Sequence, residues 1–262
     1  MMNYWKDDKT EVRYQFLRPA EIVKRREAMP VAWVPLGTIE WHGVHNPIGS
    51  DTLQAEGICT IAARKGGGLV MPPVYFGDVR VDGEIIETIP EWKNDKITAA
   101  LGLPVENFGS DRYPFTKKEQ QKNYHNLLLQ ILYEVQSFGF KVCVFVIGHY
   151  PLIGPAKKAV MDFSTRGNPM SAWAFVDYEL LCDRYDYAGD HAAYWETSHM
   201  LALYPELVDR SLLPDRGEEL LGIVPTKGHL PQDADADFGY HIMEETVDIA
   251  LQEVQHRIAD ME

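Results

Sequence analysis

Three continuous apolar runs, separated by helix-like segments, limit most strongly how this chain can fold. The runs are Val31–Leu36, Lys141–Ile147 and Ser171–Val176, and apolar residues occupy consecutive rather than alternate positions in them. Strands of that composition are buried on both faces, as in parallel sheets that helices cover. The order of strands and helices therefore predicts an α/β fold, in which a mostly parallel sheet is the centre of three α/β/α layers.

The segments between these runs predict helices and one weaker strand. Leu69–Tyr75 is strand-like, but its prolines place it at an edge or a strand end. Residues 77–116 have no clear period and are rich in aromatic residues, so we expect an oligomer contact or a lid there. No linker is visible, and residues 1–262 are predicted to form a single domain. The predicted helices are Arg18–Ala28, Ser50 to about Lys65, Lys118–Phe138, Pro155–Phe163, Trp195–Tyr204 and Glu244–Ala259.

Composition excludes several classes of function. A chain of 262 residues with 45% hydrophobic content can bury a large core. The net charge of −14, from 25 basic and 39 acidic residues, argues against a nucleic-acid partner. No apolar run reaches the roughly 20 residues of a membrane span, and the first residues do not resemble a secretory signal. Three cysteines without motif spacing suit a reducing, cytoplasmic setting.

Side chains that bind metals follow two of the predicted strands. Glu40 and His42 come after the first run, and His149 comes after the second. In a parallel sheet the ligand site lies beyond the carboxyl ends of the strands, so we expect these side chains on one rim. Carboxylate and imidazole groups bind zinc and other first-row divalent ions. The sequence therefore predicts a metal site at this rim.

Each of these residues also has a structural interpretation. Glu40 and His42 can be solvated loop residues, and a histidine at a strand end, such as His149, is often structural. Asp51 stands at a helix start, where an N-cap aspartate contributes about 1 kcal/mol. Ser50 can take the cap position instead, which leaves Asp51 available to bridge two cations.

A third stretch, His191–Ser198, supplies further candidates. Glu196 heads a predicted helix, so it is either a ligand or a first-turn acid that suits the helix dipole. Asp177 follows the third strand and is a weaker candidate, and Tyr150 either donates its hydroxyl to a substrate or packs. Three other histidines are expected outside the site, with His45 and His125 on the surface and His199 facing elsewhere.

The stretch Pro35–Asp51 resembles the signature of the creatininase (creatinine amidohydrolase) family, roughly P-x-G-S-x-E-Q-H-G-x-H-L-P-x-x-T-D. Gly148 and His149 are similar to the family's N-G-H segment after a central strand. His191 to Ser198, continuing through Met200, is similar to H-A-G-x-x-E-T-S-x-M. The first block is specific, the second is short, and the third is moderately specific. Together they extend over most of the chain.

The resemblance implies a creatininase-like fold, a homo-oligomer that is possibly a hexamer, and a centre that holds up to two divalent ions. By matched position, Glu40, His42, Asp51 and His149 would be ligands, with Asp51 bridging. His191 matches a histidine implicated in catalysis. A glutamate of creatininase is replaced here by Pro151, and Glu196 is expected to act as a substitute ligand or as a catalytic acid. The expected metal is zinc, manganese or iron.

Departures from the family pattern concern the surroundings of the expected ligands. Ile147 stands where the family has Asn, Trp41 where Gln is common, and Tyr194 where Glu is common in many members. The stretch Val79–Thr88 replaces a Gly-Thr element. The residues expected to bind metal match the family, whereas the residues around them differ. We therefore expect a small-molecule substrate other than creatinine.

The sequence therefore predicts a metal-dependent amidohydrolase. A water activated by the metal ions would attack a cyclic or formyl amide, with His191 or Glu196 moving the proton. One alternative is a degenerate, non-catalytic homologue that serves as a binding or scaffold protein. The other is a nucleotide-binding α/β protein, although no glycine-rich phosphate loop follows a strand.

Overall fold

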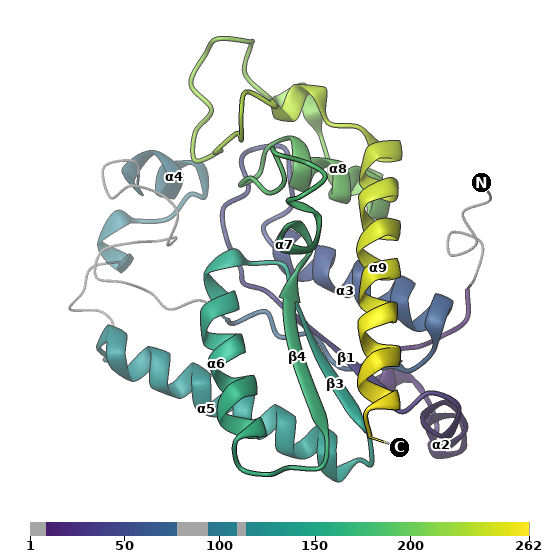
Figure 1. Ribbon diagram of the computed structural model, residues 1–262. Coiled ribbons are helices and arrows are strands. Elements are labelled where there is room, and N and C mark those ends of the chain that lie inside the picture. The colour runs from purple at the N-terminus through teal and green to yellow at the C-terminus, as the bar shows by residue number, and fades with distance from the viewer. Residues whose placement is uncertain (1–8, 78–93, 109–113, 262) are drawn as a thin grey trace.

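A parallel sheet forms the centre of the computed structural model, which describes residues 9–77, 94–108 and 114–261 (Figure 1). The strands lie in the order β2-β1-β3-β4, and all neighbouring pairs are parallel. In the β1–β3 ladder, Leu36 is paired with Ile147, so these two strands end side by side. The strands are β1 (Val31–Leu36), β2 (Leu69–Val70), β3 (Val142–Ile147) and β4 (Ser171–Val176).

Helices cover both faces of the sheet. On one face, α5 and α6 pack against side chains such as Leu36 and Phe145, and on the other face α3 and α9 pack against side chains such as Trp33 and Val144 (Figure 1). Every residue of β1 and β3 is buried, which explains the continuous apolar runs. The helices are α2 (Pro19–Ala28), α3 (Ser50–Gly66), α4 (Asn94–Ala100), α5 (Lys117–Ser137), α6 (Ile153–Ser164), α7 (Asp177–Leu181), α8 (Tyr194–Leu203) and α9 (Ala236–Ala259).

The predicted α/β fold and its parallel sheet are confirmed, but three elements differ from the expectation. The edge strand is only Leu69–Val70, because the chain after it makes a single bridge, from Val74 to Leu36. The last helix begins at Ala236, where the Asp235 side chain accepts a hydrogen bond from the Phe238 N–H. Within the segment 77–116, the described part contains α4 and a short 3-10 helix, Val105–Phe108.

Helix α4 packs against the loop that follows β1. Ile97 is fully buried and lies in one apolar cluster with Trp41, which Leu101 and Leu221 also contact. The lid or oligomer contact expected for residues 77–116 stays a prediction. Its residues 78–93 and 109–113 lie outside the described part of the chain. They include Val79–Thr88, the stretch that differs from the family pattern.

Within the described ranges, every helix is too short or too polar to cross a lipid bilayer.

Candidate metal centre

The carboxyl ends of β1 and β3 and the start of α3 meet at one point. Gly148 follows β3 directly, and a Cβ atom built on it would lie 1.8 Å from the backbone oxygen of Asp51. Gly37, after β1, would likewise bring a Cβ within 2.5 Å of the Thr52 nitrogen. Only residues without a side chain allow α3 to approach both strands this closely. The approach places Asp51 between the loops that carry Glu40, His42 and His149.

Glu40, Asp51 and His149 form the first group of metal-type side chains. Nδ1 of His149 lies 2.7 Å from Oε2 of Glu40 and 3.0 Å from Oδ2 of Asp51. All three side chains are at least 97% buried. Their ligand atoms are close enough to one another to surround a single metal ion.

His42, Asp51 and Glu196 form a second group of the same kind. Nε2 of His42 lies 2.9 Å from Oδ1 of Asp51 and 3.4 Å from Oε2 of Glu196. Asp51 therefore directs one carboxylate oxygen to each group, as a bridging ligand would. Asp51 is not the N-cap residue of α3, because that residue is Gly49. Ser50 does not take the cap position either, and its hydroxyl donates to the Pro47 carbonyl.

Backbone carbonyls fix which imidazole nitrogens carry protons. Nδ1 of His42 lies 3.1 Å from the Glu40 carbonyl oxygen, and Nε2 of His191 lies 2.9 Å from the Trp41 carbonyl oxygen. A carbonyl oxygen can only accept, so both nitrogens donate. In the neutral rings the lone pairs are then on Nε2 of His42, which faces Asp51 and Glu196, and on Nδ1 of His191, which lies 3.5 Å from Oε1 of Glu40.

A divalent cation fits these residues. Nε2 of His42 is buried, faces two carboxylates, and has no hydrogen bond of acceptable geometry among the described residues. Two lone-pair-bearing groups at such distances repel unless a proton or a metal ion lies between them. Mixed imidazole and carboxylate donors suit zinc and also manganese or iron.

The pKa values of the cluster show how strongly its charges interact. Burial alone would lower the pKa of His42, but the carboxylates of Asp51 and Glu196 outweigh it and raise that pKa well above its usual range. Burial alone would raise the pKa of Asp51, but His42 and His149 outweigh it and lower that pKa. The metal-free centre thus attracts positive charge, which a divalent ion would also supply.

The start of α8 orients Glu196. Oε2 of Glu196 accepts a hydrogen bond of 2.6 Å from the backbone N–H of Ala192, a buried residue with a positive φ of 55°. Asp190 accepts the N–H groups of Ala193, Trp195 and Glu196. Burial and the charge of Glu196 raise the pKa of Asp190 to about 8. Asp190 was not among the residues predicted from sequence, although its place directly before His191 and a helix start was a signal for a capping residue.

A cavity of about 400 Å³ opens beside the two groups. Such a volume lies within the range of small-molecule sites, roughly 300–1,000 Å³. Tyr150 and Tyr178 line it with ring centroids 5.2 Å apart, and Tyr150 is 55% exposed. Pro151 also lines the cavity but carries no donor atom.

His45, His125, Asp177 and His199 belong to neither group of metal-type side chains. His45 is buried rather than on the surface, because α8 covers it and Nε2 of His45 lies 3.0 Å from the Thr197 hydroxyl oxygen. His125 is half-buried and contacts Asp162. Asp177 is not part of either group, since it accepts the indole N–H of Trp195 at 2.7 Å. His199 faces away from the centre and contacts Gln54, as expected.

Comparison with known proteins gives matches at the level of sequence and of fold. The family model described as Creatininase, creatinine amidohydrolase, matches residues 16–89 and 78–253. Creatinine amidohydrolase of Pseudomonas putida is 24% identical over 201 residues, which are 71% of this chain and 68% of that protein. A creatininase variant of Zn–Zn type has a TM-score of 0.63 at 19% identity, and a manganese creatininase has 0.63 at 20%. Each structural match covers 94% of this chain and 98% of the other.

Proposed function

The chain belongs to the creatininase family, and from that premise we propose that it is a metal-dependent amidohydrolase. Its reaction would be cleavage of a C–N bond in a cyclic or formyl amide of a small molecule. The proposal includes a centre for up to two ions, of zinc or alternatively of manganese or iron. The forms of creatininase with zinc and with manganese support this choice of metals.

One observation carries the proposal: Glu196 and Glu40 each complete a group of donors around Asp51. In the proposed centre, Glu40, Asp51 and His149 would hold one ion, and His42, Asp51 and Glu196 would hold the other. Glu196 thereby supplies the carboxylate that Pro151 cannot. An ion held by His42, Asp51 and Glu196 would also explain why the lone pair of His42 faces two carboxylates.

When bound, such ions would supply Lewis acidity and lower the pKa of a coordinated water toward 7. The residues of the chain then have separate roles. The carboxylates of Asp51 and Glu196 orient the His42 ring, and Asp51 also contacts His149. The Trp41 carbonyl holds the His191 ring through Nε2. Nδ1 of His191 is left to receive a proton and deliver it to the leaving nitrogen. A second role for Glu196, as an acid or base, is also part of the proposal.

We propose a substrate other than creatinine. Trp41 and Tyr194 differ from the residues that are common in the family. In sequence, Trp41 lies between Glu40 and His42, and Tyr194 lies between His191 and Glu196. The cavity of about 400 Å³ suits a small amide. The single domain, the homo-oligomer and the cytoplasmic setting stay predictions.

The second candidate function is a non-catalytic homologue that binds a small molecule or serves as a scaffold. Pro151, which replaces a ligand of creatininase, is the observation in its favour. The two candidates differ in one measurable respect, because only the hydrolase turns over an amide.

A panel of cyclic and formyl amides tests the proposal. The protein is freed of metal with a chelator, reloaded separately with zinc or manganese, and assayed beside His191→Asn. We expect hydrolysis of at least one amide only after reloading. His191→Asn should lower kcat by about 10²–10⁴-fold, as for loss of a general acid or base. Metal binding without any turnover across the panel would favour the non-catalytic homologue.

A further inference from the structure

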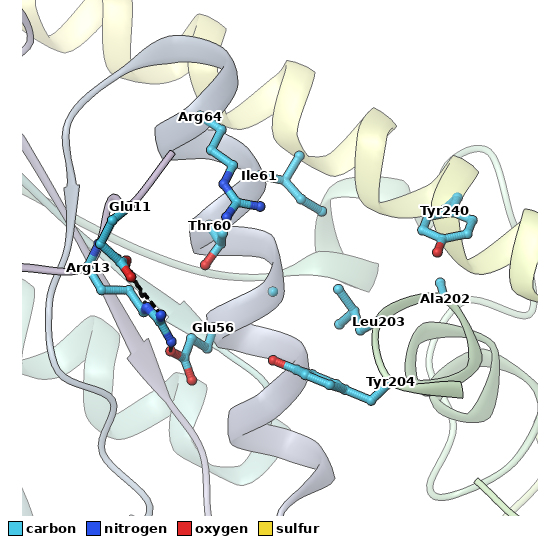
Figure 2. Close-up of a pocket in the computed structure, with 11 residues that line it drawn as sticks. Glu11, Arg13, Glu56, Thr60, Ile61, Arg64, Ala202, Leu203, Tyr204 and Tyr240 are labelled. Carbon is cyan, nitrogen blue, oxygen red and sulfur yellow. Dashed lines mark hydrogen bonds and ion pairs between the residues drawn. The ribbon is translucent and has the colours of Figure 1, made fainter. Parts of the chain in front are cut away.

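A second cavity, of about 330 Å³, lies outside the candidate centre (Figure 2). The strand-like segment that carries Glu11 and Arg13 forms one wall, and the stretch of α3 from Glu56 to Arg64 forms another. The end of α8 and Tyr240 of α9 complete it. Asp51 and Glu196 lie in the first turns of α3 and α8, whereas the cavity is lined by later residues of the same two helices.

Glu56 is an anion with weak pairing at one end of this cavity. Its side chain is only 14% exposed, and its nearest cationic atom is Nη1 of Arg13 at 4.0 Å, beyond hydrogen-bond distance. Arg13 is already bound by Glu11, with distances of 2.9 and 2.7 Å to the two carboxylate oxygens. Burial raises the pKa of Glu56, as expected for a carboxylate that lacks good donors.

Glu56, Thr60 and Arg64 lie on one face of α3. They are spaced four residues apart, so their side chains follow one another along the helix. Figure 2 shows them in a row along this helix, with Arg64 at the end remote from Glu56. The two end positions are about 12 Å apart along the helix axis, at 1.5 Å per residue. One wall thus presents a negative end, a hydroxyl and a positive end.

The opposite wall is largely apolar. Leu203 and Tyr204 come from the end of α8, and Tyr240 comes from α9. Figure 2 shows the hydroxyl end of Tyr204 directed toward the side of the cavity where Glu56 lies. Burial and the charge of Glu56 raise the pKa of Tyr204, so this hydroxyl stays neutral. A ligand here would contact aromatic and aliphatic side chains along its length and charges at its ends.

We propose that this cavity binds a small zwitterion of the ω-amino acid class. Its protonated amine would contact Glu56, its carboxylate would contact Arg64, and its methylene chain would lie on Leu203 and Tyr204. An ammonium group supplies the donors that Arg13 does not provide to Glu56. Opposite charges separated by a flexible apolar chain match the ends and the wall of the cavity. This site is separate from the proposed metal centre and does not depend on it.

Three probes of matched chain length test the site by calorimetric titration. They are 6-aminohexanoate with both charges, hexylamine with the cation alone, and hexanoate with the anion alone. We expect 6-aminohexanoate to bind most tightly. Glu56→Gln should weaken 6-aminohexanoate and hexylamine by about tenfold or more, because each loses a charged hydrogen bond, and leave hexanoate unchanged. Glu56→Asp, which keeps the charge but shortens the reach, should weaken them less.

Arg64→Gln should show the complementary pattern, with weaker binding of 6-aminohexanoate and hexanoate and unchanged binding of hexylamine. Asp248→Asn and Lys65→Gln are matched controls, because this exposed pair lies outside the cavity and the substitutions change the net charge equally. All affinities should be the same with and without a metal chelator. The proposal is overturned if no probe binds saturably, if Glu56→Gln leaves binding intact, or if chelation abolishes binding.

Discussion

Oε2 of Glu196 lies 3.4 Å from Nε2 of His42, and Oδ1 of Asp51 lies 2.9 Å from the same nitrogen. The three residues come from the start of α8, the loop after β1 and the start of α3. In the proposed centre, Glu196 would supply the carboxylate that Pro151 cannot. Without the carboxylate of Glu196, the second group would have only two donors.

Substitution of Glu196 should remove one ion selectively. In Glu196→Gln the amide oxygen can still accept the Ala192 N–H, so the start of α8 should stay folded. The charged donor for the His42–Asp51 group is lost, and we expect metal content to fall by about one equivalent of the two in a two-metal site. Elemental analysis measures this, with Glu179→Gln, a lysine-paired acid away from the centre, as the control. Equal metal content in both variants would contradict the assignment.

Trp41 is expected to position His191. Its indole N–H donates to the Leu221 carbonyl at 2.9 Å, while its own carbonyl accepts from Nε2 of His191. Trp41→Phe loses the indole bond, which should cost about 1 kcal/mol of unfolding free energy. It should also lower kcat about tenfold if the shifted loop displaces the imidazole by even a fraction of an ångström.

The test compares kcat, KM and the ¹⁵N chemical shifts of the His191 ring in the two proteins. Trp173→Phe, on β4 and away from the centre, is the control. A loss of stability in Trp41→Phe with unchanged kcat and unchanged ring shifts would show that Trp41 only packs.

The close approach of Gly148 to α3 predicts a large effect of one methyl group. In Gly148→Ala the new Cβ would lie 1.8 Å from the Asp51 oxygen, so β3 and α3 must separate. We expect a loss of about 3 kcal/mol or more in urea unfolding, at the upper end for overpacking, together with weaker metal binding. Gly154→Ala is the matched control, because it lies in α6 with no neighbouring atom within 4 Å. It should be neutral or stabilising by up to about 1 kcal/mol. Similar stabilities of the two variants would contradict the geometry.

His45 should contribute an acid-sensitive part to the stability of the metal-free protein. Burial, with a further contribution from His42, lowers the pKa of His45 to about 4 in the folded chain, against about 6.5 when unfolded. Between these values the unfolded chain binds a proton that the folded chain does not. The contribution of His45 to the free energy of unfolding should therefore be fully present above pH 6.5 and fall as the pH drops toward 4, by up to about 3 kcal/mol.

Urea unfolding of the metal-free protein from pH 7 to pH 4 measures this dependence. The free energy of unfolding of the wild-type protein relative to that of His45→Gln should fall in that window, whereas His256→Gln, an exposed histidine on α9, should follow the wild-type curve. Identical slopes for the wild-type protein and His45→Gln would contradict the role given to burial.

The main strands were predictable from sequence because burial on both faces leaves a direct trace in composition. Strands β1, β3 and β4 match the predicted runs almost residue for residue. The first turns of α9 left no such trace. Gly239 interrupts their pattern, and it is needed because a Cβ there would lie 2.0 Å from the Ser198 oxygen of α8. The contact between α8 and α9 thus requires a glycine at position 239, although the local helix propensity of glycine is low.

The gathering of Glu40, His42 and His149 was predictable because parallel strands end on one rim. The burial of His45 was not, since it depends on Thr197 of α8, far along the chain. For the same reason the role of Glu196 could not be decided from sequence, and it could be either a metal ligand or a first-turn acid that suits the helix dipole. Its direction toward His42 is set by the Ala192 N–H, in a backbone conformation that the sequence does not reveal.

The metal content of the native protein, purified without chelators or added metal, tests the central claim most directly. The arrangement of donors around Asp51 predicts about two equivalents of zinc, manganese or iron per chain, as in other two-metal hydrolytic sites. About one equivalent would mean that Glu196 does not complete the second group. No metal, even after soaking in zinc and manganese salts, would contradict the account of the centre.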